Sequence, residues 1–285
     1  MGKLMKCLVI GHLTRDIIIR GSLIETRIGG GAYYSAAALS DFCNVDVLTS
    51  YGEDFPREWI KNLWENGIRV IAVPAEGSTI YRLEYLDANR RELALLSKAE
   101  PIKELPGGGY DIIILNPVAG EIGIETVKAA RESGTLVAAD VQGFIRQHTL
   151  GKVRVKGVPF EVFKGIHVLH ADVSEIKHVN DLDPAGVGVL LISNGEERGT
   201  VYRKGREYRY RPATVQVGET TGAGDVFLAT FTYFHHEYPF VQALKRAGAL
   251  TALFLKYRHF DFSGEEINKM AMRVYVEPAG ERKAL

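Results

Sequence analysis

An acid lies within a glycine-rich turn that leads into an apolar segment. The stretch VGETTGAGDVFLATF, residues 217–231, places Asp225 directly after Gly222, Ala223 and Gly224. The N-terminus of a helix carries unpaired N–H groups and a partial positive charge, and glycines there let the backbone approach an anion closely. A carboxylate beside such a phosphate cradle repels phosphate unless it accepts a proton from the hydroxyl that attacks the phosphate. The pattern therefore indicates phosphoryl transfer with Asp225 as the base.

A structural alternative exists for the same stretch. It makes Asp225 an ordinary acid of a first helical turn, the glycines a tight turn, and Thr221 an N-cap rather than a phosphate ligand. Two other phosphate-binding motifs do not fit. A dinucleotide fingerprint needs a third glycine at a spacing that the chain lacks, and a Walker loop needs a GK[ST] sequence that does not follow the turn.

Composition narrows the class of protein. The chain has 285 residues, 46% of them apolar, which suits one large domain with a sizeable core. Its formal net charge is zero, so no general attraction to nucleic acid or to an anionic membrane is expected. Cys7 and Cys43 are too few to form a metal site, and we expect them to be buried free thiols in a reducing cytoplasm.

Apolar runs typical of buried strands alternate with helical segments. The expected strands are 6–11, 45–52, 110–118, 135–143, 165–172 and 186–195, and the expected helices include 32–42, 56–68 and 124–134. This alternation predicts an α/β fold with a parallel sheet covered on both faces. Ligands of such sheets bind beyond the carboxyl ends of the strands.

Two segments interrupt that alternation. Residues 15–31 and 78–102 each have the pattern of strand, turn and strand. We expect them to form a small sheet that projects as a lid over the main one. The alternative is that they are edge strands of the main sheet.

Six motifs, in order along nearly the whole chain, resemble those of the ribokinase-like (PfkB) carbohydrate kinases. They are GHLTRD (11–16), GGGAYYSAAAL (29–39), YGEDFP (51–56), ADVSE (171–175), LLISNG (190–195) and ETTGAGD (219–225). The resemblance implies a single domain over 1–285, a three-layer α/β/α sandwich with a mostly parallel central sheet and a small β-sheet lid. Within the family, GGGAYYSA, DVQGFIR and PFVQALKRA resemble an archaeal subgroup described as myo-inositol kinases.

The resemblance also implies roles on the acceptor side. Asp16 would accept hydrogen bonds from substrate hydroxyls. Gly29, Gly30 and Gly31 would let a hydroxylated ring lie against backbone, and Tyr33 would close the pocket or else be a core aromatic. In the DVQGFIR stretch, Gln142 and Arg146 end a strand where ligands gather, and an arginine fork can hold a phosphate or a polyol.

On the donor side, the implied ligands are ATP and Mg²⁺. Glu175 would organise Mg²⁺ through water, because hard cations near phosphates keep waters of their own. Ser193, Asn194 and Gly195 would border the nucleotide, together with Thr221, Gly222 and Gly224. Asn268 would reach the adenine. Backbone N–H groups of the glycine turn would stabilise charge on the transferred phosphoryl group.

Three positions depart from the family pattern. Tyr34 stands where the family has an asparagine, Glu219 replaces an aspartate, and Asp172 replaces an asparagine. The loss of an amide at position 34 argues against the usual ribose pocket. We therefore predict a cytoplasmic kinase, monomer or homodimer, that phosphorylates a small polyol, with myo-inositol as the expected acceptor. A nucleoside or sugar kinase and a silent nucleotide-binding protein are the competing hypotheses.

Overall fold

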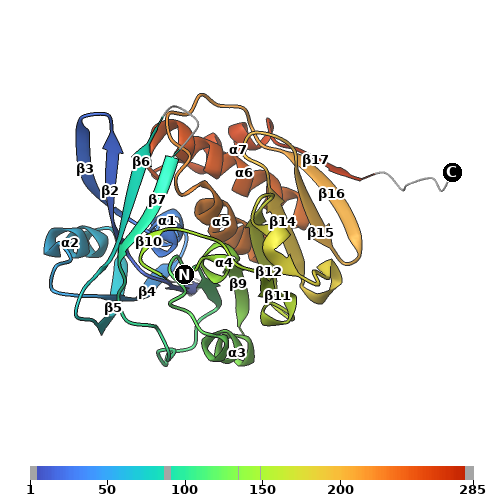
Figure 1. Ribbon diagram of the computed structural model, residues 1–285. Coiled ribbons are helices and arrows are strands. Elements are labelled where there is room, and N and C mark those ends of the chain that lie inside the picture. The colour runs from blue at the N-terminus through green and yellow to red at the C-terminus, as the bar shows by residue number, and fades with distance from the viewer. Residues whose placement is uncertain (1–4, 87–90, 134, 148, 280–285) are drawn as a thin grey trace.

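The computed structural model describes residues 5–86, 91–133, 135–147 and 149–279. Ten strands form the central sheet (Figure 1), in the order β17-β16-β15-β14-β12-β9-β8-β1-β4-β5. Seven neighbouring strands run parallel: β14 (Val189–Ser193), β12 (Val168–Asp172), β9 (Leu136–Asp140), β8 (Ile112–Leu115), β1 (Lys6–Ile10), β4 (Asn44–Tyr51) and β5 (Ile68–Pro74). Three antiparallel strands complete one edge: β15 (Gly199–Arg203), β16 (Arg206–Arg211) and β17 (Tyr275–Pro278).

The central strands are continuous apolar runs, and successive residues of a strand point to opposite sides. Both faces of the sheet are therefore apolar. On β1, Cys7 and Val9 belong to one core cluster, and Leu8 and Ile10 belong to another. The first cluster packs under α1 (Gly31–Leu39), α2 (Arg57–Glu65), α5 (Ala223–Glu237), α6 (Phe240–Tyr257) and α7 (Gly264–Ala271). The second packs under α3 (Ile124–Glu132) and α4 (Gln142–Ile145). The three-layer α/β prediction is confirmed.

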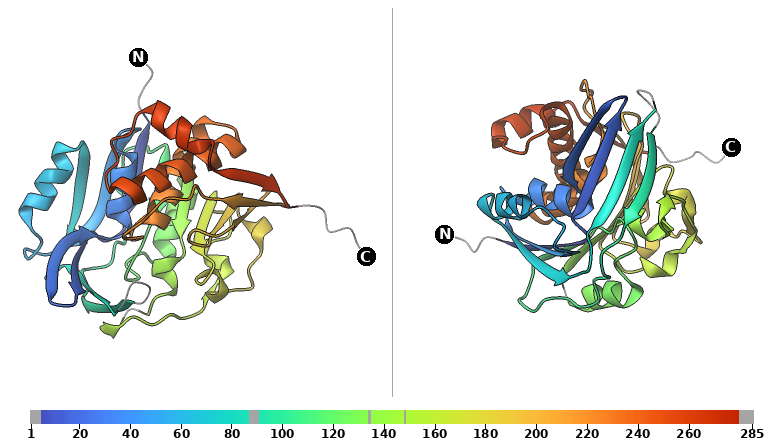
Figure 2. Two further views of the ribbon diagram at one scale, coloured as in Figure 1. Left: turned by 90° about the horizontal axis from the view of Figure 1, so that it is seen from above. Right: turned by 60° about the vertical axis from the view of Figure 1, so that its left-hand side comes forward.

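A second sheet stands beside the first (Figure 2). Its five strands are β10 (Gly151–Lys152), β7 (Arg91–Ser97), β6 (Thr79–Tyr85), β2 (Thr14–Arg20) and β3 (Leu23–Gly29), in that order. The segments expected to form a lid lie in this sheet, where β2 pairs with β6 in parallel and with β3 antiparallel. Residues 87–90, inside the expected segment 78–102, lie outside the described ranges.

The local sequence explains where two helices begin. At α7, Ser263 and Glu266 form a capping box, in which each side chain satisfies a backbone N–H of the other residue. At α5, Gly222 precedes the helix with a φ of 86°, and no side chain caps this end. No capping side chain therefore uses the N–H groups at the start of α5, and these groups and the partial positive charge of the helix end can interact with a bound anion.

The cysteine prediction is wrong. Cys7 and Cys43 are joined by a disulfide, with their Cα atoms 6.4 Å apart. Cys43 immediately precedes β4, which pairs with β1, so strand pairing brings the two sulfur atoms together inside the core. Across the described ranges, none of the helices combines the length and the apolar content needed to cross a bilayer.

Candidate active site

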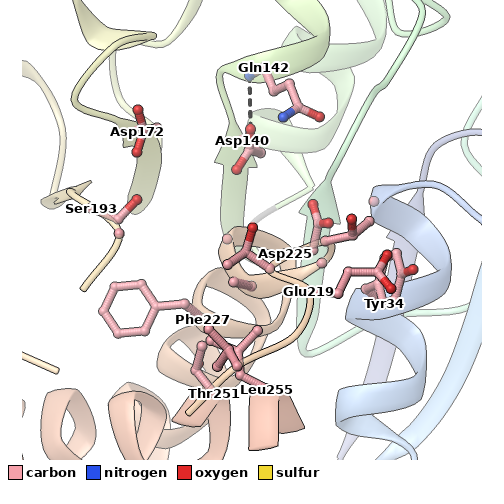
Figure 3. Close-up of a pocket in the computed structure, with 18 of the residues that line it drawn as sticks. Tyr34, Asp140, Gln142, Asp172, Ser193, Glu219, Asp225, Phe227, Thr251 and Leu255 are labelled. Carbon is pink, nitrogen blue, oxygen red and sulfur yellow. Dashed lines mark hydrogen bonds between the residues drawn. The ribbon is translucent and has the colours of Figure 1, made fainter. Parts of the chain in front are cut away.

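A cavity of about 710 Å³ opens where the carboxyl ends of β9, β12 and β14 meet the N-terminus of α5 and the lid strands β2 and β6 (Figure 3). Asp225 lies in its middle. Asp16 and Tyr81 line the lid side, while Asp172 and Ser193 line the opposite side. The sheet therefore delivers the polar residues at its strand ends to one place, as expected for a parallel sheet.

Asp225 has the environment of a reactive carboxylate. Its side chain reaches the cavity but is closely surrounded by protein, and this burial raises its pKa to about 7, helped by the negative charge of Asp140. A hydrogen bond from Asn116 Nδ2 to Asp225 Oδ1, at 2.9 Å, opposes the rise, as do the charges of His170 and Arg146. A carboxylate with a pKa near neutrality is suited to general-base chemistry.

The sequence analysis missed Asn116. It follows β8 directly and is fully buried, and its amide donates both to Asp225 and to Ser35 Oγ, each at 2.9 Å. A signal was present in the chain, since Asn116 is a polar residue at the carboxyl end of the apolar strand IIIL. Nothing in the sequence says that this strand lies opposite α5, so its partner could not be predicted.

The glycines of the turn make room for neighbours as well as for a ligand. A Cβ on Gly222 would lie 2.5 Å from the ring of Tyr34, and one on Gly224 would lie 2.9 Å from His170 Cε1. The three N–H groups also differ. Ala223 donates its N–H to Thr220 O at 3.2 Å, whereas no comparable bond engages Gly222 or Gly224 within the described residues. The glycine N–H groups are the better candidates for holding an anion.

On the acceptor side, Asp16 is buried and accepts a hydrogen bond from Thr14 Oγ1 at 2.7 Å. The three consecutive glycines that follow β3 or end it are each packed too closely against a neighbour to carry a side chain. A Cβ on Gly29 would lie 2.0 Å from Asp16 Oδ2, and one on Gly31 would lie 2.2 Å from Asn116 Oδ1. Gly30 combines a φ of 94° with a close approach to a backbone carbonyl.

Arg146 and Tyr81 line the same cavity. The Tyr81 hydroxyl donates to Val118 O at 2.6 Å, and Arg146 donates to the same carbonyl at 3.3 Å. The guanidinium carbon of Arg146 lies 5.7 Å from the centre of the Tyr81 ring. Both side chains are thereby held at the cavity with hydrogen-bonding groups close to Asp16.

On the donor side, a carboxylate network joins the ends of the two strands β9 and β12. Glu175 accepts hydrogen bonds from Asp172 N at 2.9 Å and from Gln142 Nε2 at 3.2 Å. Asp140 accepts one from the Gln142 N–H at 2.8 Å (Figure 3). Burial, together with the charge of Asp140, raises the pKa of Glu175.

Glu219 ties the glycine turn to the lid. Its carboxylate lies 3.1 Å from Arg27 Nη1 on β3 and 3.4 Å from Arg20 Nη2 on β2. Burial acts against the charge, but Arg27, a hydrogen bond from Thr221 and the charge of Arg258 lower the pKa of Glu219. The longer side chain, where the family has an aspartate, reaches arginines across the cavity mouth.

Most of the expected site residues line this one cavity. They are Asp16, Gly30, Gly31, Gln142, Arg146, Glu175, Ser193, Gly195, Thr221, Gly222, Ala223, Gly224 and Asp225. Four others do not line it: Gly29, Tyr33, Asn194 and Asn268. Tyr33 packs on Tyr34 with ring centres 5.0 Å apart, and Asn268 is exposed on α7.

Comparison with solved structures agrees with this architecture. A pyrophosphate-dependent kinase of the ribokinase family, solved with a pyrophosphate analogue and myo-inositol, superposes with a TM-score of 0.77 at 21% identity, over 93% of this chain and 99% of that one. The ribokinase of Arabidopsis thaliana, solved with ribose and ATP, gives 0.72 at 18% identity, over 94% and 99%. The fold of this chain is thus ribokinase-like.

Sequence comparison points to the same family as the motifs. Residues 166–264 match the model of the pfkB family carbohydrate kinases, in agreement with the predicted resemblance. Inositol 3-kinase of Arabidopsis thaliana is 26% identical over 248 residues, which cover 78% of this chain and 66% of that protein. Inositol 3-kinase of Zea mays is 25% identical over 79% and 65%. The match thus spans just under two thirds of these relatives, which are plant enzymes rather than the archaeal ones expected.

Proposed function

We propose that this protein transfers the γ-phosphoryl group of ATP to a hydroxyl of myo-inositol. The observation that carries the proposal is the position of Asp225. It lies at the start of α5, between the acceptor-side residues around Asp16 and the glycine turn, with a pKa raised to about 7. A base at this point is within reach of an acceptor hydroxyl and of a phosphate held by the turn.

The two oxygens of Asp225 have different tasks in this mechanism. Asn116 holds Oδ1, which fixes the plane of the carboxylate and leaves Oδ2 to take the hydroxyl proton. The freed oxygen then attacks the γ-phosphorus in line with the departing ADP. The N–H groups of Gly222 and Gly224 stabilise the negative charge that spreads over the equatorial oxygens.

The acceptor side fits a compact, hydroxyl-rich ring. Asp16 accepts hydrogen bonds from neighbouring hydroxyls, and Arg146 donates to others. The remaining wall is less polar and suits the C–H face of a ring; it consists of Tyr81, Leu83, Tyr85, Leu93 and Val118. The plant relatives are named inositol 3-kinases, and a structural neighbour holds myo-inositol, so the chemistry of the wall and the relatives agree.

The donor side favours a nucleotide over pyrophosphate. Beyond the glycine turn the cavity continues into a recess of mainly apolar and small residues: Tyr210, Pro212, Ala213, Val215, Phe227, Gly248, Thr251, Ala252 and Leu255 (Figure 3). A purine ring can fill such a recess, whereas pyrophosphate has no apolar part that would use it. Structural neighbours include pyrophosphate-dependent kinases, so the donor needs a direct test.

Magnesium fits the site through the phosphates rather than through a protein cage. Within the described residues, no group of three or more His, Cys, Asp or Glu side chains is arranged to hold a metal directly. Glu175, at the cavity wall, would hold Mg²⁺ through its waters. Bound there, the ion would neutralise charge on the donor phosphates. Partners would be small molecules only, in a cytoplasmic monomer or homodimer.

The test is ADP or phosphate release from purified protein with Mg²⁺. Donors are ATP and pyrophosphate, and acceptors are myo-inositol, ribose, fructose 6-phosphate, adenosine and buffer alone. Fast turnover with ATP and myo-inositol alone supports the proposal. Turnover with a sugar or a nucleoside would keep the mechanism and reject the acceptor. Turnover with pyrophosphate alone would reject the donor, and binding without any turnover would favour the silent nucleotide-binding protein.

A further inference from the structure

Three side chains from neighbouring strands form a hydrogen-bonded chain at the donor side of the cavity. His170 Nδ1 lies 2.6 Å from Asp140 Oδ2, and His170 Nε2 lies 3.1 Å from Ser193 Oγ. Strand pairing sets this contact, because His170 is the direct partner of Asp140 in the register of β12 and β9. Asp140 and His170 are buried, whereas Ser193 is half-buried and lines the cavity (Figure 3).

The first bond fixes one proton on the imidazole. A carboxylate only accepts, so His170 Nδ1 donates to Asp140. The second bond can run either way. If Nε2 also carries a proton, it donates to Ser193 Oγ, and the serine O–H must point elsewhere. If Nε2 is bare, it accepts the serine proton, and Ser193 offers no donor to the cavity.

The surroundings of His170 favour the doubly protonated ring. Burial acts against its charge, but Asp140, with Glu175 and Asp225 nearby, raises the pKa of His170. These carboxylates face the ring from β9, from the turn after β12 and from α5. The other faces are closed by Gly224, where a Cβ would lie 2.9 Å from the ring, and by the edge of Phe227. With both nitrogens protonated, His170 would be a buried cation whose bond to Ser193 is its contact with the donor side of the cavity.

We propose that Asp140 and His170 act as a positioning pair that turns the Ser193 hydroxyl outward, as a hydrogen-bond donor to the donor phosphates. This inference rests on the proposed function, since it needs a phosphate-bearing donor in the cavity. Ser193 is the residue that touches the ligand, and His170 acts through it. A hydroxyl donating to a charged phosphate oxygen is among the stronger hydrogen bonds in proteins.

The same three residue types form the triad of serine hydrolases, in which a neutral imidazole takes the proton of the serine. Here the direction is reversed. An imidazolium has no lone pair with which to accept that proton, so Ser193 is not activated as a nucleophile. The arrangement serves binding rather than covalent chemistry.

The experiment measures the Kd for Mg·ATP by titration calorimetry, from pH 6 to pH 9, which does not depend on any acceptor. Ser193→Ala should weaken binding about tenfold at pH 6, the size expected for one hydrogen bond to a charged group. Ser193→Thr, which keeps the hydroxyl, should restore it. Ser133→Ala, at the end of α3 and away from the cavity, is the matched control.

The pH dependence and the double variant separate positioning from a structural role. As pH rises through the raised pKa of His170, the wild-type protein should lose its tighter binding of Mg·ATP relative to Ser193→Ala. Titration of the nucleotide affects both proteins equally, so it cancels in the ratio of the two Kd values. Adding His170→Gln to Ser193→Ala should weaken Mg·ATP binding little further. The melting temperature of this double variant must show that it is folded. The Ser193 variants leave the buried pair intact, so they remain informative if His170→Gln does not fold.

Equal affinity of wild type and Ser193→Ala, or a tenfold ratio that stays constant to pH 9, would overturn the proposal. So would phosphate on Ser193 after incubation with Mg·ATP, since that would make the serine a nucleophile. Failure of the proposed donor looks different, because the wild-type protein would then bind no nucleotide at all. A wrong acceptor, or binding without turnover, would leave these Kd measurements unaffected.

Discussion

Two carboxylates within one domain, those of Glu121 and Asp225, have opposite surroundings. Glu121, fully buried before α3, accepts hydrogen bonds from the backbone N–H groups of His12, Val118 and Ala119 at 2.7–3.1 Å. Burial acts against its charge, but His12 and these N–H groups lower its pKa. Asp225 has one side-chain donor among the described residues, Asn116, and its pKa is raised to about 7.

The difference shows what makes a buried acid reactive. A carboxylate that accepts several hydrogen bonds from backbone N–H groups is stable as an anion. It can serve as a structural joint, by which we mean a side chain that links two backbone segments through hydrogen bonds. Glu121 joins the segment after β1 to the segment after β8 in this way. A carboxylate with few donors and a like charge nearby holds its proton more tightly and can take one from a substrate. Asp225 is of this second kind.

We expect the largest effect from a substitution of Asp225, the reactive carboxylate of the two. Asp225→Asn removes the base, so turnover should fall by roughly 10²–10⁴-fold while Mg·ATP binding is kept. Burying the charge of Asp225 costs free energy at neutral pH, so the variant should also melt at a higher temperature. Steady-state ADP release and thermal melting test both points, with Asp181→Asn as a surface control. Unchanged turnover would remove Asp225 as the base.

Glu121→Gln should do the reverse. The amide cannot accept from all three backbone donors, and its NH₂ group faces one of them. We expect the free energy of unfolding to fall by about 2–4 kcal/mol, while turnover per folded molecule changes little. Denaturant melts and activity at a temperature where both proteins are folded measure this, with the exposed Glu132→Gln as control. A large loss of turnover in the folded variant would show that Glu121 is not merely a structural joint.

Asn116→Ala makes Asp225 still poorer in donors. Removing the amide should raise the pKa of Asp225 further, so the acidic limb of the pH–rate profile should move up by about one pH unit. Turnover at pH 7 should then fall several-fold and largely recover at pH 9. Asn62→Ala, exposed on α2, is the matched control. A profile that keeps its midpoint but drops at every pH would mean that Asn116 acts by some other route.

We expect the smallest effect in the pH dependence of stability. As pH rises, the contribution of Asp225 to stability should fall and that of Glu121 should grow. The pKa of Asp225 is higher in the folded state, so folding is favoured below pH 4 and this advantage is lost as pH rises to about 7. The pKa of Glu121 is lower in the folded state, so its contribution is present above about pH 4.5 and is lost as pH falls. Melting differences against Asp225→Asn, measured from about pH 4 to pH 8, and against Glu121→Gln, measured from about pH 2 to pH 5, should therefore slope in opposite directions.

Local patterns in the sequence were enough for the class of fold. Apolar runs such as IIIL and LVAAD could only be buried strands, and their alternation with helices requires a parallel sheet. The turn TGAGD marked both the proposed base and the helix start within a single short segment. These features are local, because propensity, spacing and helix-end electrostatics act over a few residues.

Contacts between distant segments could not be predicted in this way. Asn116 reaches Asp225 across 109 positions of the chain, and Cys7 meets Cys43 because β1 pairs with β4. The role of His170 was likewise hidden, since a histidine in the strand VLHAD has no signal that distinguishes a core residue from a site residue. Its meaning comes from the register that sets it against Asp140.

The sequence alone thus determined the layers of this protein and the acid in its glycine turn, and its motifs predicted the family resemblance with which the match of residues 166–264 agrees. The tertiary structure decided that Glu121 accepts several backbone hydrogen bonds and that Asp225 accepts few. The physical reason is that a pKa and a hydrogen-bond direction depend on what surrounds a group in space. For Asp225 those surroundings come from Asn116, Asp140, His170 and Arg146, which the chain brings together only when the sheet has formed.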